Sequence, residues 1–168
     1  MPRITPINLQ TASQEVRTAV ESHLSQGYRL TNEKLTLLHN VKAFEALEAQ
    51  SYAVDRELQR LVGKRAADFF EYAISVENDC PVCTTYFGRL LRSMGIEDFE
   101  HFAFTPEEEL MIEYGRAIAK DPKRIPEGLF ERLRAVFDEE TLVVMTTMGV
   151  FMIANNVFND ALQVAPEP

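Results

Sequence analysis

Residues 64–95 read KRAADFFEYAISVENDCPVCTTYFGRLLRSMG, and this stretch decides the fold. Apolar residues recur at helical spacing on both sides of the polar pair Asn78-Asp79. That pair favours a turn, and Gly95 is a typical helix stop. The pattern predicts a helical hairpin over 64–95. The only two cysteines of the chain, Cys80 and Cys83, fall where the turn meets the second helix.

The rest of the chain has the same helical period. No alternation of apolar and polar residues is long enough to predict a strand. Thr105-Pro106-Glu107-Glu108 is a strong helix start, with a capping residue, a proline at the first position and an acidic residue three after the cap. We predict one all-α domain, a helical bundle over 1–168, with further helices at about 11–26, 31–39, 41–62, 105–120, 126–137 and 139–163.

Composition restricts the classes of partner. The chain has 168 residues, and its 17 basic and 26 acidic residues give a formal net charge of −9. That charge disfavours contact with nucleic acid or anionic lipid, so neither is expected as a partner. Hydrophobic residues make up 46% of the chain, as in folded globular proteins. The start of the sequence does not resemble a signal peptide, and we expect a cytoplasmic protein.

The segment from Thr141 to Asn159 contains no charged residue and is long enough to cross a bilayer. Six polar side chains within it would be unfavourable in hydrocarbon: Thr141, Thr146, Thr147, Asn155, Asn156 and Asn159. We therefore predict a helix in the centre of a bundle or at a subunit contact, and no membrane span. Together with the apolar faces of the hairpin, this helix predicts a homo-oligomer.

The motif Cys80-Pro81-Val82-Cys83 places two sulfurs one turn apart at a helix start, within reach of a disulfide. Free backbone N–H groups and the helix dipole stabilise a thiolate there. This geometry favours redox chemistry. The alternative is that two small cysteines fill the core, where free cysteine is common.

A metal site has less support. Structural zinc normally takes four ligands, and the only histidines are His23, His39 and His101. We expect no metal and no cofactor. A Cys-Cys-His site with one open position stays as the alternative.

The segment from Lys64 to Gly95 resembles the carboxymuconolactone decarboxylase and alkylhydroperoxidase D-like family. The family motif is an acidic residue, a Cys twelve positions on, then x-x-Cys, then a His four positions after the second Cys. The resemblance implies an all-helical fold that assembles through the hairpin into a dimer, trimer or hexamer. It also implies reduction of a small-molecule hydroperoxide, or exchange with a disulfide-bearing redox partner protein. In the redox members the second cysteine attacks and the first resolves, which gives those roles to Cys83 and Cys80.

Two positions depart from the family motif. Asp68 stands where Glu is common, and Phe87 stands at the His position, where a phenyl ring cannot take a proton. Antiparallel pairing of the hairpin places Asp68 opposite Phe87 and Cys80 opposite Ser75. Glu71 is then a closer carboxylate. The candidate catalytic residues are therefore Cys83, Cys80, Asp68 and Glu71, although ordinary solvated helix charge explains the two carboxylates equally well.

The leading functional hypothesis is a thiol-dependent antioxidant oxidoreductase that uses the cysteine pair. The second is a redox-sensing or small-ligand-binding member of the same family with little or no catalysis. The third is a lactone decarboxylase, which needs no cysteines. The intact Cys80 and Cys83 and the negative net charge argue against it.

Overall fold

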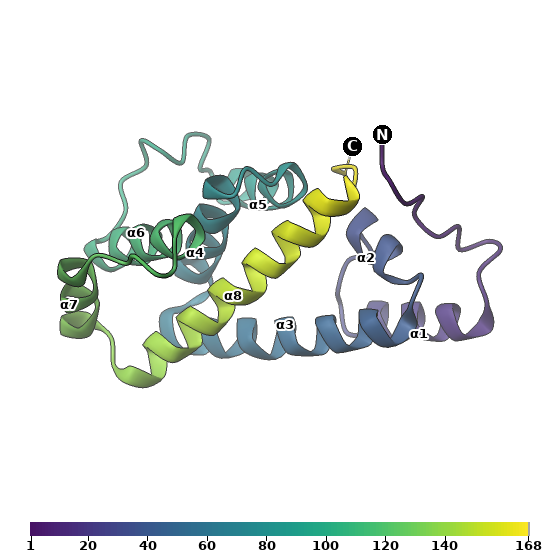
Figure 1. The fold of residues 1–168 in the computed structure, drawn as a ribbon, viewed down its shortest axis with the longest axis horizontal. Helices are drawn as coiled ribbons and strands as arrows, with labels where there is room; N and C mark the ends of the chain where they lie inside the picture. Colours follow the sequence, from purple (N-terminus) through teal and green to yellow (C-terminus); the bar gives the residue numbers. More distant parts are fainter. Residues whose placement is uncertain (168) are drawn as a thin grey trace.

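The computed structural model describes residues 1–167, which form eight α-helices and no strand (Figure 1). The predicted all-α domain is confirmed. The helices are α1 Gln14–Ser25, α2 Asn32–Leu37, α3 Val41–Val62, α4 Lys64–Glu77, α5 Pro81–Ser93, α6 Pro106–Lys120, α7 Glu127–Val136 and α8 Glu139–Leu162. The predicted bounds of α3 match, the hairpin begins at Lys64 as predicted, and α8 ends one residue before the predicted limit. The predicted ranges of α6 and α7 include capping residues, whereas those of α1 and α2 also extend beyond the caps.

Side-chain caps explain where most helices begin. Ser13, Asn40 and Asp138 each accept a hydrogen bond from the backbone N–H three residues later. At α6, Thr105 and Glu108 form a reciprocal capping box, as the sequence predicts. These bonds satisfy backbone donors that the first turn of a helix leaves free.

Helix α4 is the centre of the bundle, in contact with α3, α5, α6 and α8. Four side chains on two successive turns of α4 have no exposed surface: Phe69, Phe70, Ala73 and Ile74. A helix that is apolar on more than one face must be covered on more than one side. The cysteine-bearing α5 is therefore attached to a helix that is enclosed by the core.

Gly115 allows α6 to approach α4 closely. A Cβ atom at this position would lie 3.1 Å from the backbone oxygen of Phe70 and 3.2 Å from Cγ1 of Ile74. The backbone oxygen cannot move aside as a flexible side chain can. A glycine in the interior of α6 is thus required by the spacing of the two helices.

A second, smaller core lies in the N-terminal part of the chain. It joins α1, α2 and the start of α3 through side chains that include Val16, Val20, Leu38 and Phe44. Helix α3 extends from this core to the main core and forms one long side of the molecule (Figure 1). Only Gly63, with φ of 84°, separates α3 from α4, and a residue with a side chain rarely adopts that conformation.

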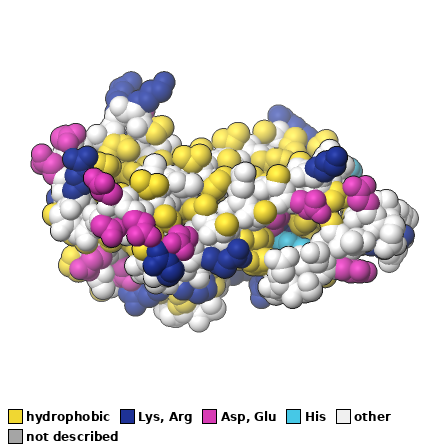
Figure 2. All heavy atoms as spheres, turned by 90° about the horizontal axis from the view of Figure 1, so that it is seen from below, with side chains coloured by type: hydrophobic (Ala, Val, Ile, Leu, Met, Phe, Trp, Pro, Cys, Tyr) yellow, Lys and Arg dark blue, Asp and Glu magenta, His cyan; other side chains and the backbone are white. Residues whose placement is uncertain are grey.

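Helix α8 crosses α3 obliquely in Figure 1. By length and hydropathy alone it could span a membrane, but the core helix of a soluble bundle has the same composition, and 39% of its most apolar window is buried. Val143, Val150 and Val157, spaced seven residues apart, remain more than half exposed. Figure 2 shows hydrophobic side chains exposed across the middle of one face of the molecule, with many of the charged side chains nearer its edges.

We predict that Gly115→Ala lowers the free energy of unfolding by about 1–3 kcal/mol, because the added methyl group overpacks the contact between α6 and α4. Gly128→Ala is the matched control, since Gly128 lies in α7 with nothing within 4 Å of the new Cβ. There the higher helix propensity of alanine should stabilise by up to about 1 kcal/mol. Chemical denaturation measures both. Equal effects at the two positions would contradict the close packing described for Gly115.

Candidate functional site

The two cysteines meet at the start of α5. Cys80 is the N-cap residue, and its Sγ accepts a hydrogen bond from the backbone N–H of Cys83 at 3.4 Å. The two Sγ atoms are 2.8 Å apart, and both thiols are free. The backbone N–H of Cys80 donates to the carbonyl of Ser75 at 3.1 Å, so the predicted pairing across the turn is confirmed. The backbone conformation at the start of α5 therefore already holds the two sulfur atoms in contact.

Both sulfurs lie in a nearly closed apolar environment. The exposed fraction is 0% for Cys80 and 6% for Cys83. They cluster with Val82 of α5 and with Val164 beyond the end of α8, and Phe158 and Leu162 cover the cluster. Access to the sulfurs is therefore limited to small molecules unless the surrounding segments move.

Asparagine side chains of α8 reach this apolar cluster. Nδ2 of Asn159 donates a hydrogen bond to Sγ of Cys83 at 3.4 Å. One turn earlier, Oδ1 of Asn156 accepts a hydrogen bond from Nδ2 of Asn78 at 2.9 Å. Both α8 side chains have only 1% exposure. The sequence places these asparagines on the apolar helix and connects neither of them to the cysteines. The structure places Asn159 against the Cys83 thiol.

The environment separates the pKa values of the two thiols. The hydrogen bond between the two sulfurs lowers the pKa of Cys80, and this effect outweighs burial. The same bond, together with burial, raises the pKa of Cys83 strongly. These directions favour ionisation of Cys80 before Cys83. The family resemblance assigns the attacking thiolate to Cys83, so the directions of the two pKa shifts and the resemblance give opposite orders.

Glu33 is a second residue without a role in the sequence analysis. It lies in α2, and its charge contributes to raising the pKa of Cys83. Helix α2 is held at the C-terminal segment because Nδ2 of Asn32 donates to the carbonyl of Ala165 at 3.1 Å. Glu33 also faces Lys34, with 3.8 Å between Oε1 and Nζ. No local sequence signal connects this short helix to a motif about 50 residues away.

Asp68 and Glu71 are both buried carboxyls on α4. Asp68 accepts two hydrogen bonds from Nζ of Lys64, at 2.7 and 2.9 Å, yet burial still raises its pKa. Burial, followed by the neighbouring charge of Asp55, raises the pKa of Glu71 well above its usual range. Neither carboxyl is among the main groups that shift the pKa of the sulfurs. Their catalytic role stays a prediction.

Phe87 belongs to the main core and packs there with Ala67, Phe70 and other residues of α4 and α6. The side chains that cluster with the cysteines form a separate group. The three histidines are also occupied elsewhere: His23 lies beside Glu48, His39 bonds the carbonyl of Thr5, and His101 pairs with Asp98. Within residues 1–167, no group of three or more His, Cys, Asp or Glu side chains is placed to hold a metal ion.

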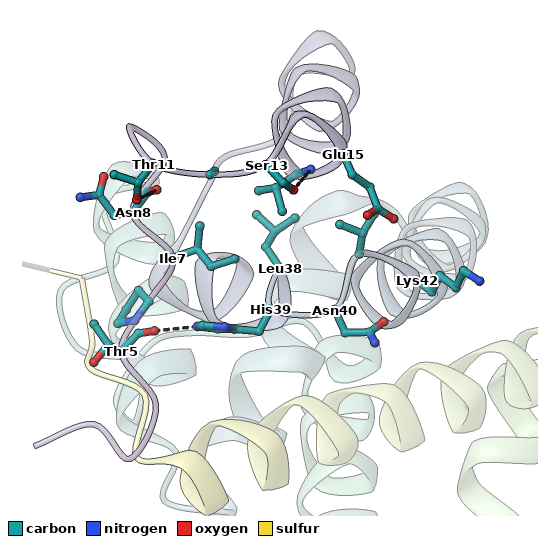
Figure 3. A pocket seen from close by; sticks show the side chains of 14 residues that line it. Thr5, Ile7, Asn8, Thr11, Ser13, Glu15, Leu38, His39, Asn40 and Lys42 are labelled. Carbon is teal, nitrogen blue, oxygen red and sulfur yellow. Dashed lines mark hydrogen bonds between the residues drawn. The ribbon is translucent and has the colours of Figure 1, made fainter.

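A hollow of about 460 Å³ lies where the end of α8 meets the start of α5, and neither cysteine lines it. Its lining includes Pro81, Asn159 and Val164, together with Asp79 and the first two residues of the chain. A larger hollow of about 800 Å³ lies beside the N-terminal segment, where α1 and α3 begin (Figure 3). Neither cysteine lines that second hollow. The smaller hollow is nearer to the pair, because Pro81 follows Cys80 in the chain and Asn159 contacts the Cys83 sulfur.

We predict that Cys80 ionises at lower pH than Cys83 when each is studied alone. In Cys83→Ser, the new hydroxyl and the backbone N–H at position 83 can still donate to the Cys80 thiolate. In Cys80→Ser, the remaining thiol keeps the burial and the nearby Glu33 charge that raise its pKa. Ultraviolet absorbance of the thiolate against pH measures both, with Cys80→Ser/Cys83→Ser as the blank. The reverse order would restore the attacking role to Cys83.

No protein-family model matches the sequence, and no curated protein matches it. Solved structures are similar at the level of the fold. One is an uncharacterised peroxidase-related protein from Silicibacter sp. TM1040, which is 16% identical over 97% of this chain and 92% of that chain, with a TM-score of 0.75.

Two further structures are of the debrominase Bmp8. The apo form is 19% identical, with a TM-score of 0.77. A cysteine-to-alanine variant in complex with 2,3,4-tribromopyrrole is 16% identical, with a TM-score of 0.78. In both, the match covers 98% of this chain and 91% of the other. The chain therefore has an all-α, alkylhydroperoxidase D-like fold that carries a CxxC pair at the start of α5.

Proposed function

We propose that the chain is a thiol-dependent antioxidant oxidoreductase that works through Cys80 and Cys83. The observation that carries the proposal is the contact between the two sulfurs, 2.8 Å apart at a helix N-terminus, in an environment that shifts the two pKa values in opposite directions. A thiolate at this position is a nucleophile, and its neighbour is ready to close a disulfide. The peroxidase-related structural neighbour agrees with this chemistry.

The reaction with a hydroperoxide can be written from the pair alone. The Cys80 thiolate attacks the terminal oxygen, the O–O bond breaks, and Cys80 becomes a sulfenic acid. The leaving alkoxide takes the proton of Cys83 and departs as an alcohol. The Cys83 thiolate then attacks the Cys80 sulfur, which forms the disulfide and releases hydroxide, and a solvent proton converts the hydroxide to water. The peroxide is reduced by two electrons, and the pair is oxidised.

In these steps the Cys83 thiol supplies the proton that the histidine of the family motif would supply. Phe87 cannot exchange a proton and lies in the main core. In this mechanism the second thiol is the acid for the leaving oxygen, because its sulfur lies 2.8 Å from the attacking sulfur. A dithiol or a disulfide-bearing partner protein would return the pair to its reduced form.

The redox-sensing function is a second candidate, and the burial of both sulfurs favours it. A sensor needs only to oxidise once and stay oxidised, whereas an enzyme must be reduced again in each turnover. Repeated turnover with a small dithiol therefore separates the two.

We predict that one equivalent of hydrogen peroxide converts the reduced protein to an intramolecular disulfide, with a mass loss of two hydrogens that dithiothreitol reverses. With excess dithiothreitol, peroxide consumption should continue over many turnovers. Cys80→Ser and Cys83→Ser should each abolish disulfide formation within one chain. Intact-mass spectrometry and peroxide consumption measure these outcomes. Oxidation only to sulfinic acid or to cross-linked dimers would rule the mechanism out, and a single slow oxidation without turnover would favour the sensor.

We also propose that the chain forms a homo-oligomer through the exposed valines of α8. Val143, Val150 and Val157 lie on one line of the helix and expose 64%, 57% and 60% of their surface. Seven-residue spacing is the repeat with which helices pack along each other. A second copy of the chain can cover these three valines with the same three valines of its own α8.

We expect the native protein to sediment as a dimer or larger species at micromolar concentration, and Val150→Glu to shift it towards a 19.2 kDa monomer. The reason is that a charge in the middle of an apolar contact is desolvated without a partner. Val136→Glu is the control, since Val136 is equally exposed but lies at the end of α7. Analytical ultracentrifugation that finds the native chain to be a monomer would refute the proposal.

A further inference from the structure

The sulfurs of Cys80 and Cys83 are covered from more than one side. Their apolar cluster contains Val82 of α5, two side chains of α8, and Val164, which lies beyond the end of α8. Cys80 is fully buried, Cys83 keeps 6% exposure, and neither cysteine lines either hollow. A reactant larger than a few atoms therefore reaches the pair only after part of this cover moves.

The helical parts of the cover are packed into the bundle. Helix α8 contacts α3, α4 and α6, and α5 contacts α4. Residues 163–167, which we call the strap, form no helix. Gln163 ends α8 in the left-handed conformation, with φ of 51°, and the chain then lies between α5 and α2 (Figure 1). A terminal segment of this kind opens at lower cost than a core helix, so the strap is the part of the cover that moves first.

Hydrogen bonds from α2 and α5 hold the strap in place. Nδ2 of Asn32 donates to the carbonyl of Ala165 at 3.1 Å, and the backbone N–H of Asn32 donates to Oε1 of Glu167 at 2.5 Å. Arg89 of α5 donates to the carbonyl of Glu167 at 3.0 Å. Val164 is the residue of the strap that packs on the cysteines, and it is 7% exposed. The contacts that close the strap therefore lie outside the main core.

The two halves of the proposed reaction need different amounts of space. Hydrogen peroxide has two heavy atoms, whereas reduction of the disulfide brings a third sulfur to the pair. The thiolate of a dithiol attacks one cysteine sulfur, the bond between Cys80 and Cys83 breaks, and the other cysteine leaves as a thiolate. The second thiolate of the dithiol then displaces the first cysteine. The pair gains two electrons, and the dithiol becomes a disulfide. The mixed disulfide in between has no room while Val164 covers the sulfurs.

We propose that residues 163–167 are a strap that determines which reactants reach the cysteine pair. When the strap is closed, a molecule as small as hydrogen peroxide reaches the sulfurs. A thiol reductant reaches them only when Val164 has moved away. The role of the strap in turnover rests on the oxidoreductase function proposed above, whereas its effect on access is a property of the fold.

The test measures access to the sulfurs of the reduced protein. The probe is a maleimide that carries a polyethylene glycol chain, which is bulky and uncharged, and its alkylation rate is divided by the thiolate fraction from ultraviolet absorbance. Asn32→Ala/Glu167→Ala removes both hydrogen bonds from α2 to the strap. We expect the corrected rate to rise about fourfold or more, because loss of one hydrogen bond favours opening by roughly two- to tenfold.

Val164→Ala is the second variant, which leaves α2 unchanged and removes part of the apolar cover, and it should also raise the rate. Gly115→Ala is the matched control, because it weakens the packing of α6 on α4 without touching the strap. It should alkylate at the native rate. An unchanged rate in the strap variants would overturn the proposal. An equal rise in Gly115→Ala would also overturn it, since access would then come from unfolding of the whole domain.

A second measurement connects the strap to turnover. Reduction of the oxidised pair by dithiothreitol should be faster in the strap variants, while disulfide formation with hydrogen peroxide should keep the native rate. Equal acceleration of both reactions would mean that the strap does not select by size. The failure of the strap and the failure of the enzyme are distinguishable. If the native protein forms its disulfide with peroxide but the strap variants alkylate at the native rate, the strap is wrong and the oxidoreductase stands. If peroxide does not oxidise the native pair but the strap variants alkylate faster, the enzyme is wrong and the control of access stands.

Discussion

The enclosure of α4 by α3, α5, α6 and α8 is the constraint on which the rest of the structure depends. Phe69, Phe70, Ala73 and Ile74 of α4 are fully buried, and Gly115 lets α6 come close enough to cover them. The turn after α4 then sets the place of Cys80, through the hydrogen bond between Cys80 and Ser75. The position of the reactive pair is thus a consequence of core packing.

The site combines apolar burial with a small number of directed polar groups. Burial alone would raise the pKa of both thiols and leave them unreactive. The hydrogen bond between the sulfurs makes the effect unequal, lowering the pKa of Cys80 at the expense of Cys83. The amides of α8 add donors without adding charge. In the proposed mechanism such a pair needs no histidine for its first proton transfer, so phenylalanine is compatible with it at position 87.

The helices themselves follow from local sequence. The period of apolar residues, the caps at Asn40 and Asp138, and the glycine at position 63 are interactions within a few residues of each other. For the same reason the sequence predicts the one-turn contact of Cys80 with Cys83 and the turn at Asn78-Asp79. The alkylhydroperoxidase D-like fold could also be predicted from the sequence, because the hairpin that holds α5 against α4 is one continuous stretch of the chain.

The partners of the cysteine pair were decided by the tertiary structure alone. Asn156 and Asn159 lie more than 70 residues from Cys83, and Glu33 lies about 50 residues away on the other side. Whether such groups meet depends on the angle at which α8 crosses the bundle and on the docking of α2, which no local pattern encodes. The same holds for Asp68 and Glu71: the sequence places them on α4 near the motif, but only packing determines that Lys64 and Asp55 are their neighbours. Local hydrogen bonds and periodicity fix helices, whereas contacts between distant residues arise only once every helix has found its place around α4.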